Sequence, residues 1–335
     1  IDFGYQHNFR QEFSAYVNHG YMPAIYPEDR QEPSDLECEF NKQVYSANLK
    51  DQIALGNHEL SFGLNTEFQD NRINGWSFLV PAFRQFSQGV FAYDKLRLDE
   101  NVWLHGALRY DFGHIEMDRY DDWFPSQLNT GTVQQLGYLT RSSDLSRNFN
   151  SLVYAIGMNF NQEHFSLKWN AGKSFRMPIA KELGANGVNY HYFSYEKGNP
   201  NLSPEVSYQF DLGLGWKTEN WSVNFSPYYN YFPNYIYLNP TAAHDYFYGA
   251  GNQVFEYAQS RVMRYGAEIQ AKANIFKGLS AEVLAEYLYS KQLSGDKKGY
   301  VLPFSPPPSV LFNLSYETDL STSLKDSFLS VDYRI

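Results

Sequence analysis

Hydrophobic and polar residues alternate at every second position along much of the chain. The segment 206–217 shows the pattern most clearly. Its apolar set is Val206, Tyr208, Phe210, Leu212, Leu214 and Trp216, and its polar or small set is Ser207, Gln209, Asp211, Gly213, Gly215 and Lys217. A period of two places these sets on opposite faces of a β-strand, whereas a helix would scatter each set around its surface. The pattern therefore predicts strands with one apolar face and one polar face.

The same alternation predicts about 13 strands, most of them roughly 10–14 residues long. They span residues 5–17, 42–55, 59–69, 89–99, 102–113, 147–160, 164–174, 205–217, 220–232, 259–274, 279–291, 307–317 and 325–334. Strands of soluble proteins usually have about five or six residues. A tilted strand that crosses a bilayer needs about 9–11, so these lengths favour a membrane-spanning sheet.

The predicted connections alternate between short turns and long loops. Short turns fall near residues 56–58, 99–101, 161–163, 218–219, 276–278 and 318–324, and long loops near 18–41, 70–88, 114–146, 175–204, 233–258 and 292–306. Outer-membrane barrels place short turns on the periplasmic side and long loops outside. We therefore predict an all-β fold, an antiparallel transmembrane β-barrel of the outer-membrane type.

The composition agrees with this fold and excludes several others. The chain has 28 Tyr, 26 Phe and 6 Trp, and many of these rings stand near strand ends. Such rings suit the two aromatic girdles of a membrane barrel, although cross-strand packing in a soluble sheet also uses them. The net charge of −10 excludes a nucleic-acid partner. Cys38 is the only cysteine, which excludes a disulfide framework and cysteine-based metal centres.

The most specific pattern lies between residues 174 and 205. Its characteristic positions are Phe175, Arg176, Pro178, Glu182, Leu183, Gly198, Asn199, Pro200, Leu202, Pro204 and Glu205. Proline holds the residue before it extended, so the two last prolines guide a long loop back into a strand. This run resembles the F-R-x-P…E-L…G-N-P-x-L-x-P-E pattern of TonB-dependent outer-membrane receptors. The segments 234–237, 264–268 and 302–307 resemble later pieces of that family in the same order.

The resemblance implies more than the residues themselves do. Receptors of this family import scarce ligands through a barrel of about 22 strands whose lumen holds a plug. Residues 1–335 would then be a partial barrel domain with about 13 of those strands, truncated at both ends and lacking the plug domain. The implied location is the outer membrane of a Gram-negative bacterium. The implied partners are outer-membrane lipid, the TonB energy-coupling complex through the missing plug segment, and a small-molecule or metal-chelate ligand.

The function implied by the resemblance is import of a scarce nutrient, with a ferric chelate (siderophore or haem) as the leading ligand class. Zinc, cobalamin and a glycan are further candidates that the loop sequences do not separate. Two alternatives remain at this stage: a passive porin or structural barrel, and a soluble carbohydrate-binding β-protein. The chain contains no G-x-S-x-G, H-E-x-x-H or phosphate-loop motif, so no enzyme is predicted.

Candidate binding residues come from the predicted loops and from the polar strand faces. Aromatic tracts on the outer loops provide flat surfaces for a ligand, although loop packing explains them equally well. The candidate ligand contacts are Trp123, Tyr190, His191, Tyr192, His244 and Tyr246. The residues predicted to face the lumen include Glu67, Arg109, Asp111, Asp211 and Glu268. The eight histidines form no closely spaced pair, so we predict neither a metal site nor a cofactor.

Overall fold

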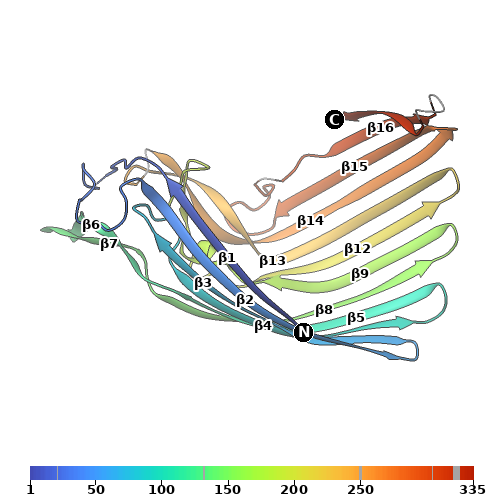
Figure 1. Ribbon diagram of the computed structural model, residues 1–335, viewed down its shortest axis with the longest axis horizontal. Helices are drawn as coiled ribbons and strands as arrows, with labels where there is room; N and C mark the ends of the chain where they lie inside the picture. The colour runs from blue at the N-terminus through green and yellow to red at the C-terminus, as the bar shows by residue number, and fades with distance from the viewer. Residues whose placement is uncertain (21, 131–132, 249–250, 304, 320–324) are drawn as a thin grey trace.

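Long antiparallel strands form the body of the protein in the computed structural model, which describes residues 1–335 except 21, 131–132, 249–250, 304 and 320–324. Fifteen of the described strands belong to one sheet, and thirteen of these follow one another in a single curved path (Figure 1). The path contains β1 (Asp2–Phe13), β2 (Leu36–Leu55), β3 (His58–Asn74), β4 (Phe83–Arg97), β5 (Val102–Met117), β8 (Leu145–Asn161), β9 (Phe165–Arg176), β12 (Glu205–Lys217), β13 (Trp221–Asp245), β14 (Asn252–Phe276), β15 (Leu279–Gln292), β16 (Ser309–Thr318) and β17 (Ser327–Arg334). Each of the thirteen predicted strands overlaps one of these, although several observed strands extend farther, so the predicted fold class is confirmed.

The remaining elements lie in the long connections. They are the hairpin of β6 (Tyr120–Thr130) and β7 (Val133–Ser142), the helix α1 (Ala180–Gly184), β10 (Asn186–Asn189) and β11 (Ser194–Lys197). Among the described residues, none of the helical structure is long and apolar enough to cross a membrane. The sheet is not closed, because β1 and β17 stand at its two ends. The result is an open trough.

Tight turns lie at one end of the trough and long connections at the other, on the right and left of Figure 1 respectively. We call these the turn end and the loop end. Two of the tightest turns contain Gly56 and Gly278, whose φ angles are 60° and 82°. Glycine adopts this left-handed conformation at little cost, which lets consecutive strands reverse within a few residues.

The predicted long loop at 233–258 is wrong. The strands β13 and β14 continue through most of it, and only residues 246–251 lie between them. The pairing of β13 with β14 shifts between Phe232 and Tyr235 and again between Pro240 and His244. Because proline lacks an N–H, a β-bulge lets the chain pass a proline and resume the ladder. Pro233 and Pro240 therefore interrupted the sequence pattern without ending the strand.

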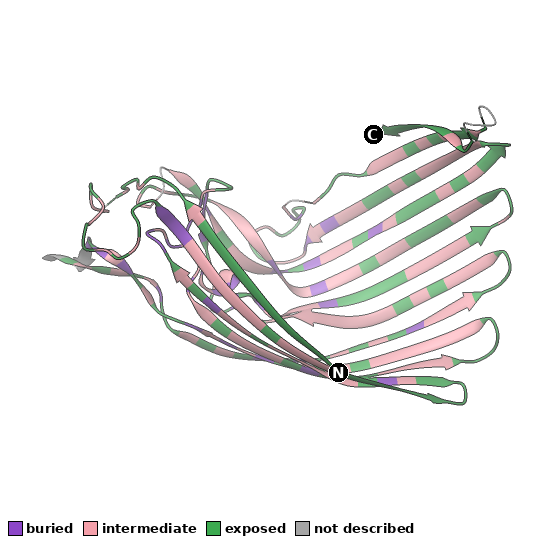
Figure 2. Ribbon diagram, viewed as in Figure 1, coloured by how far each residue is buried: buried purple, intermediate pink, exposed green. Residues whose placement is uncertain are grey.

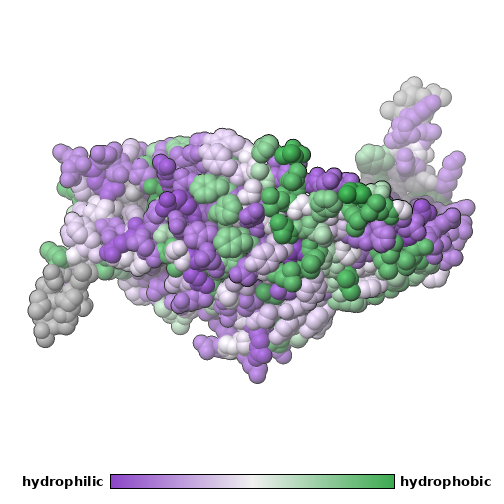
Figure 3. All heavy atoms as spheres, turned by 90° about the horizontal axis from the view of Figure 1, so that it is seen from below, coloured by the Kyte–Doolittle hydropathy of each residue, from purple (hydrophilic) through white to green (hydrophobic). Residues whose placement is uncertain are grey.

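The outward face of the sheet carries two rows of aromatic rings. At the turn end, Trp216 contacts Phe165 and Trp221 with ring centroids 5.9 and 6.5 Å apart. Nearer the loop end, the Tyr265 ring lies 5.3 Å from that of Tyr289. Aliphatic side chains lie between the rows, and in Figure 3 hydrophobic residues gather over the middle and the turn end while hydrophilic residues cover the loop end. This is the arrangement of a lipid-facing surface.

Neighbouring residues on β14 test this assignment of the two faces. Ile269 points outward and is 40% exposed, whereas Gln270 points inward and donates a hydrogen bond to Glu282. We expect Ile269→Lys to destabilise the full-length protein in lipid vesicles by about 2–4 kcal/mol, because it places a charge in hydrocarbon. The control Gln270→Lys should change the free energy of unfolding by less than about 1 kcal/mol, because its side chain stays in a polar setting. Denaturant unfolding in vesicles measures both values, and equal losses would contradict the assignment.

Candidate functional site

The segment 177–204 folds into the trough at the loop end and packs against the inner face of the sheet. The segment contributes Ala180, Leu183 and Leu202 to a buried core. These side chains pack against Ile115 on the inner face of β5 and Phe149 on the inner face of β8. These side chains are between 1% and 4% exposed. Figure 2 shows the buried residues concentrated at this end of the molecule. The inner face of the sheet is therefore covered by this segment at the loop end of the trough.

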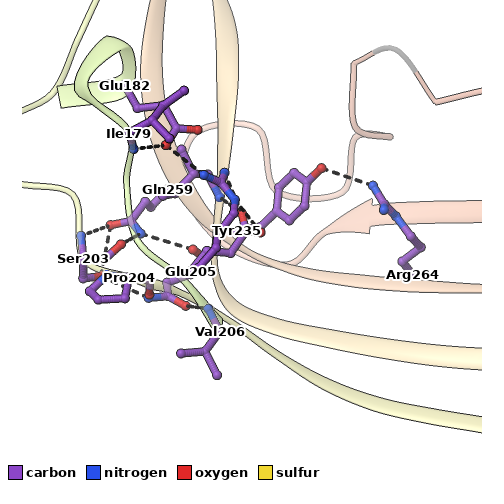
Figure 4. Close-up of polar contacts among 12 residues, drawn as sticks. Ile179, Glu182, Ser203, Pro204, Glu205, Val206, Tyr235, Gln259 and Arg264 are labelled. Atoms are coloured by element: carbon purple, nitrogen blue, oxygen red, sulfur yellow. Dashed lines mark hydrogen bonds and ion pairs between the residues drawn. The ribbon is translucent and has the colours of Figure 1, made fainter. Parts of the chain in front are cut away.

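An ionic cluster ties this segment to the sheet. Arg176, at the end of β9, donates hydrogen bonds to Glu182 of α1 at 2.8 Å and to Glu205 of β12 at 3.2 Å. Each carboxylate also accepts a backbone N–H: Glu182 from Ile179 at 3.0 Å, and Glu205 from Ile236 at 2.7 Å. The Arg176 guanidinium thus joins α1 to β9 and β12 through Glu182 and Glu205, both of which are labelled in Figure 4. We call Arg176, Glu182 and Glu205 the Arg176 cluster.

Further side chains fasten the end of the same segment. The Gln259 amide oxygen accepts the backbone N–H of Ser203 at 3.0 Å (Figure 4). The Asn234 side chain donates to the carbonyl of Pro204. A Cβ atom at Gly198 would lie 2.5 Å from the backbone nitrogen of Gly184, so only glycine permits this approach to α1. The motif residues found in the sequence thus build a structural attachment.

A second cluster joins the outer connections to one another. The Arg141 side chain of β7 is 6% exposed, pairs with Asp122 of β6 at 3.1 Å and lies 3.5 Å from the ring centroid of Tyr248. It also donates to the carbonyl of Asn186 at 3.0 Å, while the Tyr248 hydroxyl donates to Asp122 at 2.6 Å. Asp122, Arg141 and Tyr248 are far apart in the sequence and meet here. We call these three residues the Arg141 cluster.

The protonation states in the Arg141 cluster follow from its burial. Burial raises the pKa of Asp122, and Arg141 and the Tyr248 hydroxyl oppose that rise. Burial and the neighbouring carboxylate together raise the pKa of Tyr248 far above its usual value. The phenol therefore stays protonated and remains a hydrogen-bond donor at every physiological pH. Sequence reasoning missed this cluster, because its members come from three separate segments.

The six candidate ligand contacts divide into two groups, and the first is engaged within the protein. The Trp123 indole N–H donates to the carbonyl of Trp76 at 2.9 Å, and the Arg30 guanidinium lies 4.5 Å from the Trp123 ring centroid. Tyr190 packs against a buried group that includes Val188, and burial raises the pKa of its hydroxyl to about 12. These two aromatic residues hold the connections together.

His191 also has partners within the protein, and they lie across the trough. Its Nε2 lies 3.0 Å from the Arg10 guanidinium and 3.4 Å from the Glu12 carboxylate, both on β1. The strand β11 meanwhile pairs in parallel with β14, from Ser194 opposite Gln253 onward. The β10–β11 hairpin therefore reaches from β14 to β1 over the inner face.

The second group of candidates is open to solvent and lies around Gln253. Ser194 and His244 both pair with Gln253, which places the hairpin tip beside the connection after β13. Tyr192 at the tip and Tyr246 in that connection are 78% and 80% exposed, and the His244 ring lies 6.3 Å from that of Tyr246. A hollow of about 400 Å³ opens beside His244 and the buried Arg141 cluster.

Phe193 belongs with this open group, and sequence reasoning missed it. Its side chain is 75% exposed and its φ angle is 49°. Such a backbone conformation is unfavourable for a bulky residue and is concentrated at functional sites. The sequence signal was its place inside the aromatic tract 190–195. We call Tyr192, Phe193, His244 and Tyr246 the exposed ring group.

The residues predicted to face the lumen all stand on the inner face. Arg109 donates to Asp111 at 2.7 Å and to Asn65 at 2.6 Å, and these side chains line a hollow of about 320 Å³ together with Glu67. Asp211 pairs with Tyr228 in the ladder, and Glu268 pairs with Ser226, so both share that face. Within the described residues, the structure brings no three His, Cys, Asp or Glu side chains close enough to hold a metal ion.

Two adjacent aspartates test the importance of the Arg141 cluster. Asp122→Ala leaves the buried Arg141 without its carboxylate, which should destabilise the outer connections by about 3–5 kcal/mol. Asp121→Ala removes an exposed ion pair with Arg119 that lies at 2.8 Å, and such pairs contribute about 0–1 kcal/mol. Limited proteolysis within residues 118–144 and 185–193, which contain Asp122, Arg141 and Asn186, should therefore accelerate in the first variant only. Equal cleavage rates would contradict a supporting role for the cluster.

Comparison with known proteins identifies the architecture. A family model described as "TonB dependent receptor-like, beta-barrel" matches residues 1–334. The copper transporter OprC matches with a TM-score of 0.67 at 15% identity, over 84% of this chain and 42% of that one. The Serratia marcescens hemophore receptor HasR, solved with HasA and heme, gives 0.63 at 15% identity, over 89% and 52%. The FrpB iron transporter of Neisseria meningitidis (F5-1 variant) gives 0.59 at 14% identity, over 89% and 43%.

These similarities establish the fold of the chain. The share of each matched structure that they cover is also informative. The chain spans about half the length, or less, of the structures that it matches. The family model, in contrast, covers nearly the whole chain. The motif between residues 174 and 205, the inward-folded segment and the match over residues 1–334 agree: the chain belongs to the family of TonB-dependent receptors and matches the model of their β-barrel.

Proposed function

We propose that this chain is the barrel part of an outer-membrane receptor of a Gram-negative bacterium that imports a scarce nutrient, with a ferric chelate (siderophore or haem) as its ligand class. The ligand is captured by the outer connections and passes through a plug-gated barrel. The TonB energy-coupling complex supplies the driving force through a plug segment. The barrels of this family are outer-membrane proteins, and the matched structures carry out copper and iron transport or bind a hemophore with heme.

The observation that supports the proposal is the segment 177–204, which folds into the loop end of the trough. A passive porin needs an open aqueous channel. Here α1 and Leu202 pack against Ile115 and Phe149 on the inner face, and the Arg176 cluster fastens them there. A segment fastened in this way across the inner face of the sheet favours gated, energy-coupled import over passive diffusion.

The exposed ring group is the proposed site of first ligand contact. Exposed rings offer flat surfaces on which an aromatic or macrocyclic chelate can stack. The His244 imidazole adds a polar group that hydrogen-bonds or binds metal when neutral. Tyr192 and Phe193 approach from the β10–β11 hairpin, and Tyr246 and His244 from the other side of Gln253. Trp123, Tyr190 and His191, which have partners within the protein, are assigned to supporting this surface.

Growth of a strain that lacks the gene tests the proposed function. With a ferric siderophore or haem as the limiting iron source, the deletion strain should grow more slowly than the parent. The intact gene should restore growth only where TonB is present. Cultures limited for zinc or for cobalamin serve as controls for the nutrient class. Equal growth of the two strains on every candidate nutrient would refute the proposal.

Single substitutions test the exposed ring group. Tyr192→Ala and Tyr246→Ala should each weaken binding of the growth-supporting chelate by about three- to tenfold, because each removes one aromatic contact. Tyr300→Ala is the matched control, since Tyr300 is 68% exposed but belongs to the connection between β15 and β16. Whole-cell binding of the radiolabelled chelate measures the three affinities. If the control loses as much affinity as the two variants, the site is wrongly placed.

A further inference from the structure

Several buried polar atoms on the inner face of β13, β14 and β15 have no hydrogen-bond partner. They are Nε of Arg264, Oδ1 of Asn230 and both amide atoms of Gln292. Asn230 stands directly opposite Arg264 in the ladder, and Gln292 lies diagonally across from Arg264 on β15, one row nearer the loop end. Long side chains at such positions reach one another. Unpaired polar groups therefore gather at one place on this wall.

The Gln292 amide is the most deeply buried of these groups. The residue is 1% exposed, and Val262, which stands opposite it on β14, is fully buried. The connection between β15 and β16 covers this point, because its Leu302 packs against Val262 and Phe232. A buried amide is unfavourable unless it finds a hydrogen-bond partner. The position therefore favours a polar ligand between Gln292 and Arg264.

The Arg264 guanidinium is a cation without a carboxylate partner in the described part of the chain. Glu268, the next carboxylate on the inner face of β14, is four residues away, about 13 Å along a strand. Its Nη2 donates to the Tyr235 hydroxyl at 3.2 Å, and Figure 4 shows the two side chains pointing toward each other. The rings of Phe232 and Tyr235 lie 5.8 and 5.4 Å from the guanidinium. Aromatic rings attract a cation but do not neutralise its charge.

Other arginines of the inner face differ from Arg264 in this respect. Arg109 lies 2.6 Å from Asp111, and Arg334 lies 3.3 Å from Glu286. These two guanidinium groups are neutralised within the protein. A cation that stands beside an apolar cluster has lost part of its hydration, and this loss is compensated only by a counter-charge or by strong hydrogen bonds. Arg264 therefore leaves its charge to an external anion.

We propose that Arg264, Asn230, Gln292 and the Tyr235 hydroxyl bind a small oxyanion, a phosphate or a carboxylate, on the inner wall of the barrel. A guanidinium presents its N–H groups in a fork that matches two oxygens of either group. A 180° rotation of a primary amide exchanges its nitrogen and oxygen, so Asn230 and Gln292 can each turn an N–H toward the anion. The inference goes beyond the import function and does not depend on which ligand is imported.

The combination of groups selects an anion over water or a neutral solute. The Tyr235 hydroxyl accepts a hydrogen bond from Arg264, which leaves its own proton free to donate. The site thus offers donors from four side chains and one positive charge. Water can satisfy the donors, but only an anion also neutralises the charge. Arg264 and Asn230 are half-buried, so an anion reaches them from the trough, and Gln292 forms the floor of the site.

Phosphate titration of the full-length receptor in detergent tests the proposal. Arg264→Gln removes the charge, and the matched control Lys272→Gln removes another inward-facing cation of β14. Calorimetric titration with sodium phosphate at constant ionic strength measures the affinities. We expect at least about tenfold weaker binding in Arg264→Gln and a change of less than about twofold in the control, because only Arg264 has unpaired amides beside it. A second titration uses sodium acetate, and the anion that binds more tightly with the same dependence on Arg264 identifies the class of occupant.

The variant Gln292→Leu separates a binding site from a supporting role in the fold. Leucine fills the buried position without an unpaired amide, so the midpoint of thermal unfolding in the absence of phosphate should rise. The affinity for phosphate should fall by at least about threefold, because one donor is lost. A glutamine that only supported the fold would give the opposite pair of results, a lower midpoint and an unchanged affinity.

Three outcomes would overturn the proposal. One is that neither phosphate nor acetate binds to the unaltered receptor. Another is an equal loss of affinity in Arg264→Gln and Lys272→Gln, which would indicate a general effect of net charge. Chelate uptake should persist in Arg264→Gln, which separates this test from the test of import. The third outcome is therefore the loss of uptake together with anion binding, which would assign Arg264 to the import path instead.

Discussion

The structure depends on the requirement that every backbone N–H and C=O group of a lipid-facing sheet be paired within the protein. The strands meet this requirement with long, regular ladders. The pairing of β2 with β3 runs without a shift from Glu39 opposite Asn74 to Leu55 opposite His58. Because such a ladder allows no slip, it assigns every side chain to one face. The apolar outward face, the polar inner face and the direction of the inward-folded segment all follow from that assignment.

A sheet whose inner face is polar offers little apolar surface against which an inward-folded connecting segment can pack. The chain has a local exception at the loop end: Ile115 and Met117 take inner positions of β5, whereas the inner positions from His105 to Gly113 are polar or small. The segment 177–204 packs on this apolar patch. The Arg176 cluster adds hydrogen bonds that compensate the desolvation of its two largely buried carboxylates, while the guanidinium itself stays partly exposed. Apolar packing and charge pairing therefore act on the same short stretch of chain.

The sequence predicted the strands well because their signal is local. Strand β12 has the predicted bounds, 205–217, because a proline precedes it and a turn follows its alternating residues. The extension of β13 past Pro233 was not predictable, because a bulge is visible only once the partner strand is known. The Arg141 cluster was hidden for the same reason: Asp122, Arg141 and Tyr248 carry no common motif. The six candidate contacts were chosen for ring content, and that criterion does not distinguish the packed Trp123 from the open Tyr246.

The β10–β11 hairpin has a mechanical consequence. It is joined to β14 by backbone pairing and to β1 by His191, and these strands stand nine places apart in the sheet order. Within the backbone ladder, each strand is otherwise paired with its immediate neighbours. The hairpin therefore connects β1 and β14 across the concave face of the sheet. Moving these two strands apart at the loop end would strain the hairpin, and a force applied to α1 would act on both strands. The stiffness of the loop end therefore depends on a few contacts at the hairpin tip as well as on the backbone pairing of the sheet.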